Sequence, residues 1–267
     1  MLKDITLGQY FPGDSPVHRM DPRLKLVLTT AYITVLFIIK GAAAYGFMAV
    51  FNIGAVALAR LNPKQIVRGL RPMLFIFLFT AVLNMLYIPG ERELFSFWVI
   101  RVTLEGVYTG AFMVARILLL ISVTLLLTYT TSPIMLTDAM ERLMGPLKLI
   151  RVPVHELAMM MTIALRFIPN LIEDTDKIMN AQKARGADFE SGGLLRRAKA
   201  LIPLLVPLFV GAFRRADDLA MAMESRCYHG GEGRTRMKQL RLTRLDALTA
   251  LICVIWLGGA VSLRFWL

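Results

Sequence analysis

The chain has 267 residues, 56% of them hydrophobic, and a mean hydropathy of +0.58, values that exclude an ordinary water-soluble domain of this size. Its formal net charge is +12, but no basic stretch is interleaved with stacking aromatic residues, so no nucleic-acid partner is expected. We therefore expect an integral membrane protein in the lipid bilayer of the cell membrane, with its basic residues distributed by the positive-inside rule.

The first two apolar runs, residues 24–39 and 41–59, are separated by almost no loop and predict a helical hairpin. The segment that follows contains four basic residues and no acidic one: Arg60, Lys64, Arg68 and Arg71. Because basic residues concentrate in cytoplasmic loops, we expect this loop and the N-terminus on the cytoplasmic side.

Three further spans are expected. Residues 72–88 form the third, residues 89–105 an outside loop with two basic and three acidic residues, and residues 106–131 the fourth span. A last span at 247–267 would place the C-terminus outside. The predicted fold is all-α: a polytopic membrane protein with about five transmembrane helices and a cytoplasmic domain of long helices.

The long helices are expected between the fourth and the last span. Residues 132–244 carry 18 Lys and Arg against 12 Asp and Glu, too many charges for further spans. Within this part, the eleven apolar residues 203–213 are too short to cross a membrane and are expected to be a buried helix centre. The chain thus divides into a membrane domain at 1–131, a cytoplasmic domain at 132–244 and a C-terminal span at 245–267.

Catalytic and metal-binding patterns are missing from the sequence. His18, His155 and His229 are scattered and form no His-Glu-x-x-His pair, and the two cysteines lie far apart. The glycine-rich stretch 230–235 lacks the Gly-Lys-Ser/Thr ending that cradles phosphates. We therefore expect no cofactor, no metal site and no enzymatic activity in this chain, and any nucleotide would be bound by another subunit.

Arg116 lies inside the fourth predicted span, where an isolated guanidinium is costly. Two readings are open. Arg116 could belong to a transport path together with Asn84, or it could be a structural residue that pairs with Glu105 or reaches the interface.

Two long helical runs, 154–186 and 194–228, each end in a short segment centred on one arginine. The first segment is Ala184-Arg185-Gly186 and the second is Ser225-Arg226-Cys227. Small neighbours let a partner close over each guanidinium, whose fork matches a carboxylate. A plain helix-capping role explains each arginine alone, but the pair favours docking of a partner protein.

We also expect the two helices to cross at a stripe of small residues, Ala212, Ala216 and Ala220.

Several separated motifs resemble those of one family, in the same order along the chain. They are Ser132-Pro133-Ile134, Leu136-Thr137-Asp138-Ala139-Met140-Glu141, Pro153-Val154-His155-Glu156-Leu157, Ala164-Leu165-Arg166-Phe167-Ile168-Pro169, Ala181-Gln182-Lys183-Ala184-Arg185-Gly186 and Gly230-Gly231-Glu232-Gly233-Arg234-Thr235, with Gly13, His18 and Asp21-Pro22 at the start. The chain resembles the transmembrane T component of energy-coupling factor transporters over nearly its whole length.

The resemblance implies a scaffold between two ABC-type ATPase subunits and a small membrane protein, the S component, that binds a vitamin or a metal ion. It maps three coupling helices to about 132–150, 154–186 and 194–228, and the ATPase-binding motifs to the two arginine-centred segments. One departure is Cys227, where the family's second motif usually ends in glycine. The alternative is the permease of another ABC importer, with the substrate path through its own spans.

Overall fold

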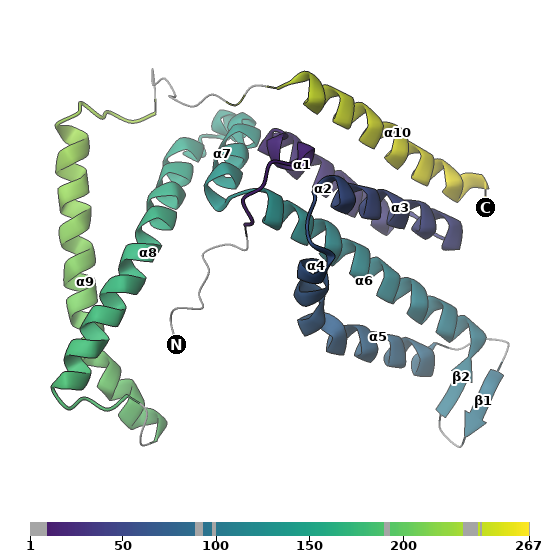
Figure 1. Cartoon of the computed structure of the whole chain (residues 1–267), viewed down its shortest axis with the longest axis horizontal. Coiled ribbons are helices and arrows are strands. Elements are labelled where there is room, and N and C mark those ends of the chain that lie inside the picture. The colour runs from purple at the N-terminus through teal and green to yellow at the C-terminus, as the bar shows by residue number, and fades with distance from the viewer. Residues whose placement is uncertain are drawn as a thin grey trace. The chain divides into compact units, whose positions relative to one another are not determined.

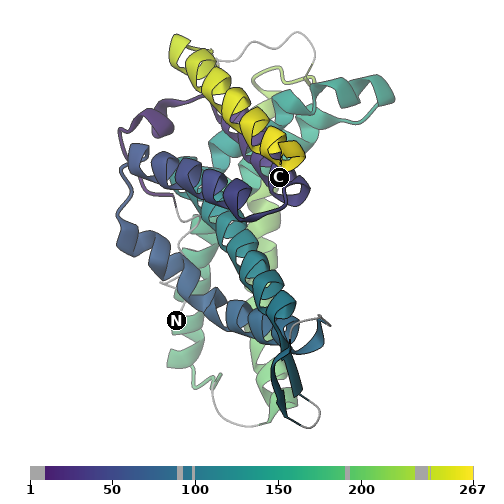
Figure 2. The same cartoon turned by 90° about the vertical axis from the view of Figure 1, so that its right-hand side faces the viewer.

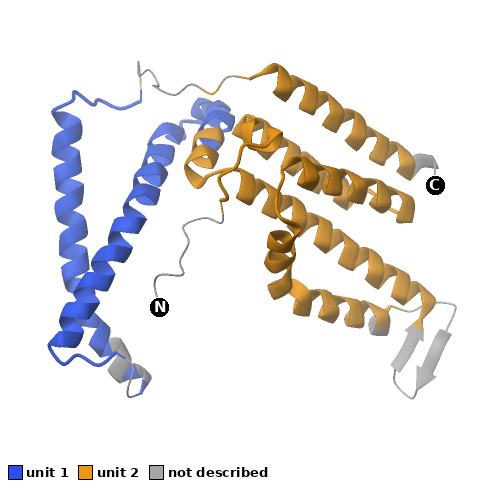
Figure 3. Cartoon of the chain, in the orientation of Figure 1, with its two compact units in different colours: residues 1–8, 140–239 blue, residues 9–139, 240–267 orange. Residues whose placement is uncertain are grey.

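The computed structural model describes residues 10–88, 93–97, 100–189, 193–231, 240 and 242–266 (Figure 1). Contacts divide the chain into two compact units (Figure 3). The first contains residues 1–8 and 140–239 and is called the coupling unit here; the second contains residues 9–139 and 240–267 and is called the membrane unit. The domain limits expected at 131/132 and 244/245 concern the membrane boundary and stay a prediction.

The membrane unit consists mainly of helices. They are α1 (Pro16–Arg19), α2 (Pro22–Ile38), α3 (Ala42–Leu58), α4 (Pro63–Leu70), the 3-10 turn η2 (Arg71–Met73), α5 (Leu74–Tyr87), α6 (Leu104–Thr130) and α10 (Arg244–Trp266). Helix α7 (Pro133–Leu143) runs across the boundary to the coupling unit, which contains η3 (Gly145–Ile150), α8 (Val154–Ala184) and α9 (Leu194–Glu224).

Three helical stretches of the described residues are long and apolar enough to cross a membrane. They are Pro63–Met85, which comprises α4, η2 and most of α5, then Leu104–Thr130 and Arg244–Arg264. Helices α2 and α3 have 17 residues each, slightly fewer than the ~20 that a span needs. The chain is thus an all-α polytopic membrane protein, as expected. The number of five spans stays a prediction.

One short hairpin interrupts the helices, in the segment expected to be a loop. Strands β1 (Glu93–Phe97) and β2 (Ile100–Thr103) pair antiparallel, with Phe97 opposite Ile100. Both are rich in aromatic and β-branched residues, which favour extended backbone. Figure 2 shows this hairpin beyond the ends of α5 and α6.

Helices α5 and α6 approach closely because α6 offers glycine at the contact. A Cβ atom on Gly106 would lie 3.1 Å from the carbonyl oxygens of Asn84 and Met85, and one on Gly110 would lie 3.2 Å from that of Ala81. The four-residue spacing of the two glycines puts both on one face of α6. This is the small-residue packing that membrane helices use where backbones nearly touch.

The core of the membrane unit lies between α2, α3, α6 and α10. Tyr32 and Met48 are almost completely buried, and the Tyr32 hydroxyl donates to the Met48 carbonyl oxygen at 3.0 Å. The rings of Phe47 and Trp256 stack with centroids 4.1 Å apart, and the indole N–H donates to the Phe47 carbonyl oxygen at 3.1 Å. The hydroxyl of Tyr32 and the indole N–H of Trp256 thus each have a backbone acceptor, as an apolar environment requires.

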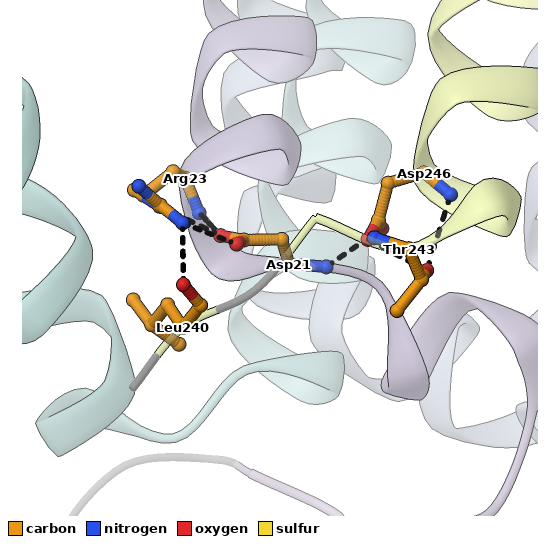
Figure 4. A network of polar contacts seen from close by, with 5 residues as sticks. All are labelled: Asp21, Arg23, Leu240, Thr243 and Asp246. Carbon is orange, nitrogen blue, oxygen red and sulfur yellow. Dashed lines mark hydrogen bonds and ion pairs between the residues drawn. The ribbon is translucent and has the colours of Figure 1, made fainter. Parts of the chain in front are cut away.

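The first turns of α2 and α10 are joined by a polar network, called the junction here (Figure 4). One oxygen of Asp246 accepts from the Asp21 amide at 2.9 Å, and the other accepts from both the amide and the hydroxyl of Thr243 at 2.8 Å. Asp21 caps α2 and binds Arg23 with both carboxylate oxygens, and Arg23 also donates to the Leu240 carbonyl oxygen at 3.1 Å. Two carboxylates thus neutralise the positive ends of two helices.

Lys25 connects the same region to the end of α6. Its side chain is buried, and its ammonium donates to the carbonyl oxygens of His18 and Thr130 and to the Thr131 hydroxyl at 3.0–3.2 Å. All three of its N–H donors therefore have acceptors, which makes the buried charge tolerable. The cation also lies at the negative end of α6.

In the coupling unit, α8 and α9 have 31 residues each, about 46 Å at the usual helical rise. They contact each other (Figure 3). Arg215 forms an ion pair with Asp174 across the contact. At the start of α8, His155 hydrogen-bonds Glu141 of α7 at 2.9 Å. The long helices thus form one crossed pair, and the C-terminal ends of both helices are exposed.

Candidate functional site

Helix α8 ends in a Schellman motif built around Gly186. The Gly186 amide donates to the Lys183 carbonyl oxygen and the Ala187 amide to that of Gln182, both at 3.0 Å. Gly186 has a φ of 85°, the left-handed conformation that this motif requires and that glycine adopts freely. Arg185 is therefore fixed at the C-cap position, the last residue before the chain reverses.

Helix α9 ends in the same way. The Cys227 amide donates to the Glu224 carbonyl oxygen at 2.9 Å and the Tyr228 amide to that of Met223 at 3.1 Å. Here Cys227 is the left-handed residue, with a φ of 56°. Arg226 consequently occupies the position in α9 that Arg185 occupies in α8.

The six residues predicted to bind the ATPases lie at these two ends. We call Ala184, Arg185 and Gly186 the α8 tip, and Ser225, Arg226 and Cys227 the α9 tip. All six are exposed, and no hydrogen bond or ion pair engages either guanidinium within the described part of the chain. A cation at a helix C-terminus is favoured by the helix dipole, and the guanidinium fork remains available for a carboxylate from another molecule.

Cysteine at the left-handed position still permits the same turn as at the end of α8. Cys227 keeps a left-handed backbone, which costs an L-residue about 1–2 kcal/mol, partly offset by the extra entropy that glycine loses on folding. The α9 tip therefore presents Arg226 in the same hydrogen-bonded turn as Arg185, at some cost in local stability.

We expect Cys227→Gly to stabilise the protein by about 0.5–1 kcal/mol, because it relieves this strain. Thermal unfolding of the purified chain measures the effect. The matched variant Ser225→Gly should destabilise, since Ser225 has a helical backbone (φ −62°) where glycine only adds disorder to the unfolded chain. A loss of stability in Cys227→Gly would contradict the strain argument.

Helix α9 has two different faces. Leu204, Leu208 and Arg215 are buried or half-buried on the side of α8. The opposite side carries an exposed apolar row, called the outer stripe here: Ile202, Leu205, Val206, Phe209 and Phe213, each 47–67% exposed. The expectation of a buried helix centre at 203–213 is therefore wrong for this chain, because α8 covers only one face of α9.

The expected crossing at three alanines is also wrong. Ala212 is half-buried, but Ala216 and Ala220 are exposed and extend the outer stripe, since they follow Phe213 at helical spacing. Helix α8 instead meets the face that bears Arg215, and the ion pair with Asp174 holds the contact. A periodic stripe of small residues shows where a neighbour could approach but not which neighbour it is.

Comparison with known proteins finds relatives that match nearly the whole chain. The family model described as "Cobalt transport protein" (CbiQ) matches residues 13–237. The chain is 54% identical over 264 residues to the energy-coupling factor transporter transmembrane protein EcfT of Thermosediminibacter oceani, with 99% of each chain covered. The proteins of the same name from Clostridium kluyveri and Lactococcus lactis are 51% and 45% identical, with 95% or more of each chain covered.

The chain belongs to the EcfT family. It is thus a transmembrane component of an energy-coupling factor transporter and a membrane protein, as the sequence motifs indicated. EcfT relatives align with the chain from end to end, so both tips and the membrane unit fall within the matched region.

In this EcfT chain Arg116 contacts two aromatic residues instead of the expected partner. Its Nε donates to the Tyr45 hydroxyl at 2.8 Å, and its guanidinium carbon lies 5.7 and 5.8 Å from the ring centres of Tyr45 and Phe37. Glu105, the expected partner, makes no such pair among the described residues. Aromatic rings stabilise the cation where water is scarce. The pairing of Arg116 with Tyr45 was not predictable, because the two lie 71 positions apart.

Proposed function

We propose that the chain couples ATP hydrolysis by two ABC-type ATPase subunits to the uptake of a vitamin or other micronutrient by a substrate-binding S component. Each ATPase binds one tip, with Arg185 or Arg226 paired to a carboxylate in a groove of its surface. Closure of the ATPase dimer then moves the two tips, and the long helices carry the motion to the membrane. The coupling unit and the N-terminus lie in the cytoplasm.

The observation that carries this proposal is the equivalence of the two tips. Two helices of equal length end in the same hydrogen-bonded turn, and each presents one exposed arginine at the same position. A helix cap alone requires neither an arginine nor two matching copies. Two ATPase subunits, each with one acidic groove, would use such a repeated cation.

The outer stripe of α9 supports a second partner that is itself apolar. Exposed rows of large apolar side chains mark protein or membrane contacts, and this one continues into the small residues Ala216 and Ala220. We assign it to the S component, whose substrate-binding body is a membrane protein. The stripe and the tips are different surfaces, so the two kinds of partner can bind together.

We expect the double variant Phe209→Ser, Phe213→Ser to bind the S component at least tenfold more weakly, since two large apolar contacts are lost. ATPase binding should be unchanged. Pull-down of both partners on tagged variants measures each. The double variant Leu149→Ser, Ile150→Ser removes two exposed apolar side chains of the coupling unit outside α9 and is the matched control. Equal S-component binding by the double variant and the control would contradict this assignment.

The rival reading, a permease with its own substrate path, has less support. Its two candidate residues are already engaged: Arg116 with Tyr45, and the Asn84 amide with the Thr80 carbonyl oxygen at 2.8 Å. Such contacts favour structural roles for both residues.

Purification of the chain from native membranes tests the proposal directly. We expect two ATPase subunits and a small membrane protein to copurify, and reconstituted uptake to require all of them. Uptake by the chain and ATPases alone would favour the permease reading. Activity of the isolated chain would contradict both.

A further inference from the structure

Helix α4 carries a basic surface that no part of the established family role explains. Lys64, Arg68 and Arg71 follow one another at helical spacing with Val67 between them, and all four are exposed. Together with Pro63 they line a hollow of about 390 Å³ on the surface of the membrane unit. Arg71 is the first residue of η2, directly after α4. We call these three cations and Val67 the basic face of α4.

The opposite face of α4 is fixed against α6. A Cβ atom on Gly69 would lie 2.7 Å from the Tyr129 hydroxyl and 2.9 Å from a Leu125 methyl group, so the backbone at Gly69 lies directly against these two side chains of α6. At about 100° per residue, Gly69 lies roughly 100–160° around the helix from each of the three cations. The contact with α6 therefore holds the three cations outward.

The helices next to α4 supply no anion for these cations. No acidic residue occurs between Asp21 and Glu91, which covers α4 and its neighbours α3 and α5, and none occurs on α6 after Glu105. Lys64, Arg68 and Arg71 form no ion pair among the described residues. Three aligned and uncompensated positive charges favour an anion from outside the chain.

The position of the basic face indicates what this anion is. Helix α4 continues through η2 into α5, and the whole stretch Pro63–Met85 is long and apolar enough to span a membrane. Leu74, Phe75 and Leu78, immediately after the basic face, are 61–74% exposed. A cationic hollow followed directly by an exposed apolar helix matches a lipid, with a charged headgroup joined to acyl chains.

We propose that the basic face of α4 binds the phosphate of an anionic phospholipid, with Lys64, Arg68 and Arg71 around the headgroup and α5 beside the acyl chains. The bound lipid holds the bend at η2, where Pro72 interrupts the helix between α4 and α5. This inference concerns the membrane unit and does not depend on the function of the tips.

The test is lipid titration of the purified full-length chain, read by native mass spectrometry. The probes are phosphatidylglycerol, phosphatidylcholine with the same acyl chains, and soluble glycerol 1-phosphate. We expect the wild-type chain to prefer phosphatidylglycerol over phosphatidylcholine. The triple variant K64Q/R68Q/R71Q should bind phosphatidylglycerol roughly a hundredfold more weakly, given the usual contribution of each basic residue near an anionic surface.

Two controls separate this site from general charge and from misfolding. The triple variant R166Q/K177Q/R214Q removes three exposed cations of the coupling unit and should bind phosphatidylglycerol like the wild type. The charge-conserving variant R68K/R71K should retain binding, and circular dichroism should show the same helix content for all variants.

Three results would overturn the proposal. One is equal binding of the two lipids. Another is undiminished binding by K64Q/R68Q/R71Q, or an equal loss in the control triple variant. The third is full displacement of lipid by glycerol 1-phosphate at comparable concentration, which would indicate a site for the free phosphate rather than for a lipid. If the triple variant instead lost a protein partner and kept its lipid, the basic face would be a protein contact.

Discussion

Replacing Arg185 or Arg226 with alanine is expected to release an ATPase subunit from the purified complex and to abolish substrate uptake. Loss of one partner from a buried charged pair at an interface costs about 2–5 kcal/mol, much of it from the carboxylate left unpaired. The affinity of the tip for its ATPase should therefore fall by roughly 30-fold or more. The fold should be unaffected, since both side chains are exposed and unpaired within the described residues.

The equivalence of the tips makes this prediction sharper. Each single variant should lose affinity for one ATPase by a similar factor, and the double variant should bind neither. Lysine at either position keeps the charge but not the fork, so it should restore only part of the affinity. Measured ATPase binding and uptake in reconstituted vesicles distinguish these cases.

Matched controls come from the same helices. Lys177→Ala on α8 and Arg214→Ala on α9 also remove an exposed cation, but neither lies at a tip. Both should bind ATPase normally. Wild-type binding and uptake in R185A and R226A would reject the tips as docking points, and an equal loss in the controls would point to overall charge.

The positions of both tips were predictable because their signals are local. The apolar period stops near residue 184 and near residue 224, and Gly186 is the residue that a Schellman turn favours. Sequence alone left the turn at Cys227 in doubt, because cysteine is unfavourable with positive φ. The hydrogen bonds of Met223 and Glu224 resolve it: the helix-end geometry is retained and the cysteine accommodates it.

What sequence reasoning missed is non-local. The apolar centre of α9 was expected to be buried, yet Phe209 and Phe213 are exposed, because hydrophobic character does not show whether the covering surface belongs to the same chain. Similarly, Thr243 and Asp246 form a Thr-x-x-Asp capping box that is visible in the sequence. Its second partner, Asp21, lies 225 positions away and could not be found from spacing.

That long-range contact leads to the second large expected effect. Asp246→Ala should destabilise the protein by about 3–5 kcal/mol, as expected when one member of a buried charged network is removed. The side chain is almost completely buried, and its loss would leave the amides of Asp21 and Thr243 without their acceptor. The carboxylates of Asp21 and Asp246 together offset the half-buried charge of Arg23 and the buried charge of Lys25, and the variant would remove one of them.

Thermal unfolding in detergent should show a midpoint lower by on the order of 10 °C. Asp246→Asn keeps the shape and one acceptor oxygen, so its effect should be intermediate. Asp14→Ala is the matched control, since its carboxylate is 94% exposed and its ion pair with Arg19 is long, at 3.7 Å. It should change stability by less than about 0.5 kcal/mol.

Hydrogen exchange separates loss of the junction from general unfolding. The Asp21 amide donates to Asp246, so it should exchange much faster in Asp246→Ala than in Asp246→Asn. The amides in the middle of α6 should change little at temperatures below the midpoint. Because the junction holds α10 to α2, movement of α10 relative to α2 should also increase, more in Asp246→Ala than in Asp246→Asn. Unchanged protection of the Asp21 amide in Asp246→Ala would show that the contact between α2 and α10 does not hold the two helices together.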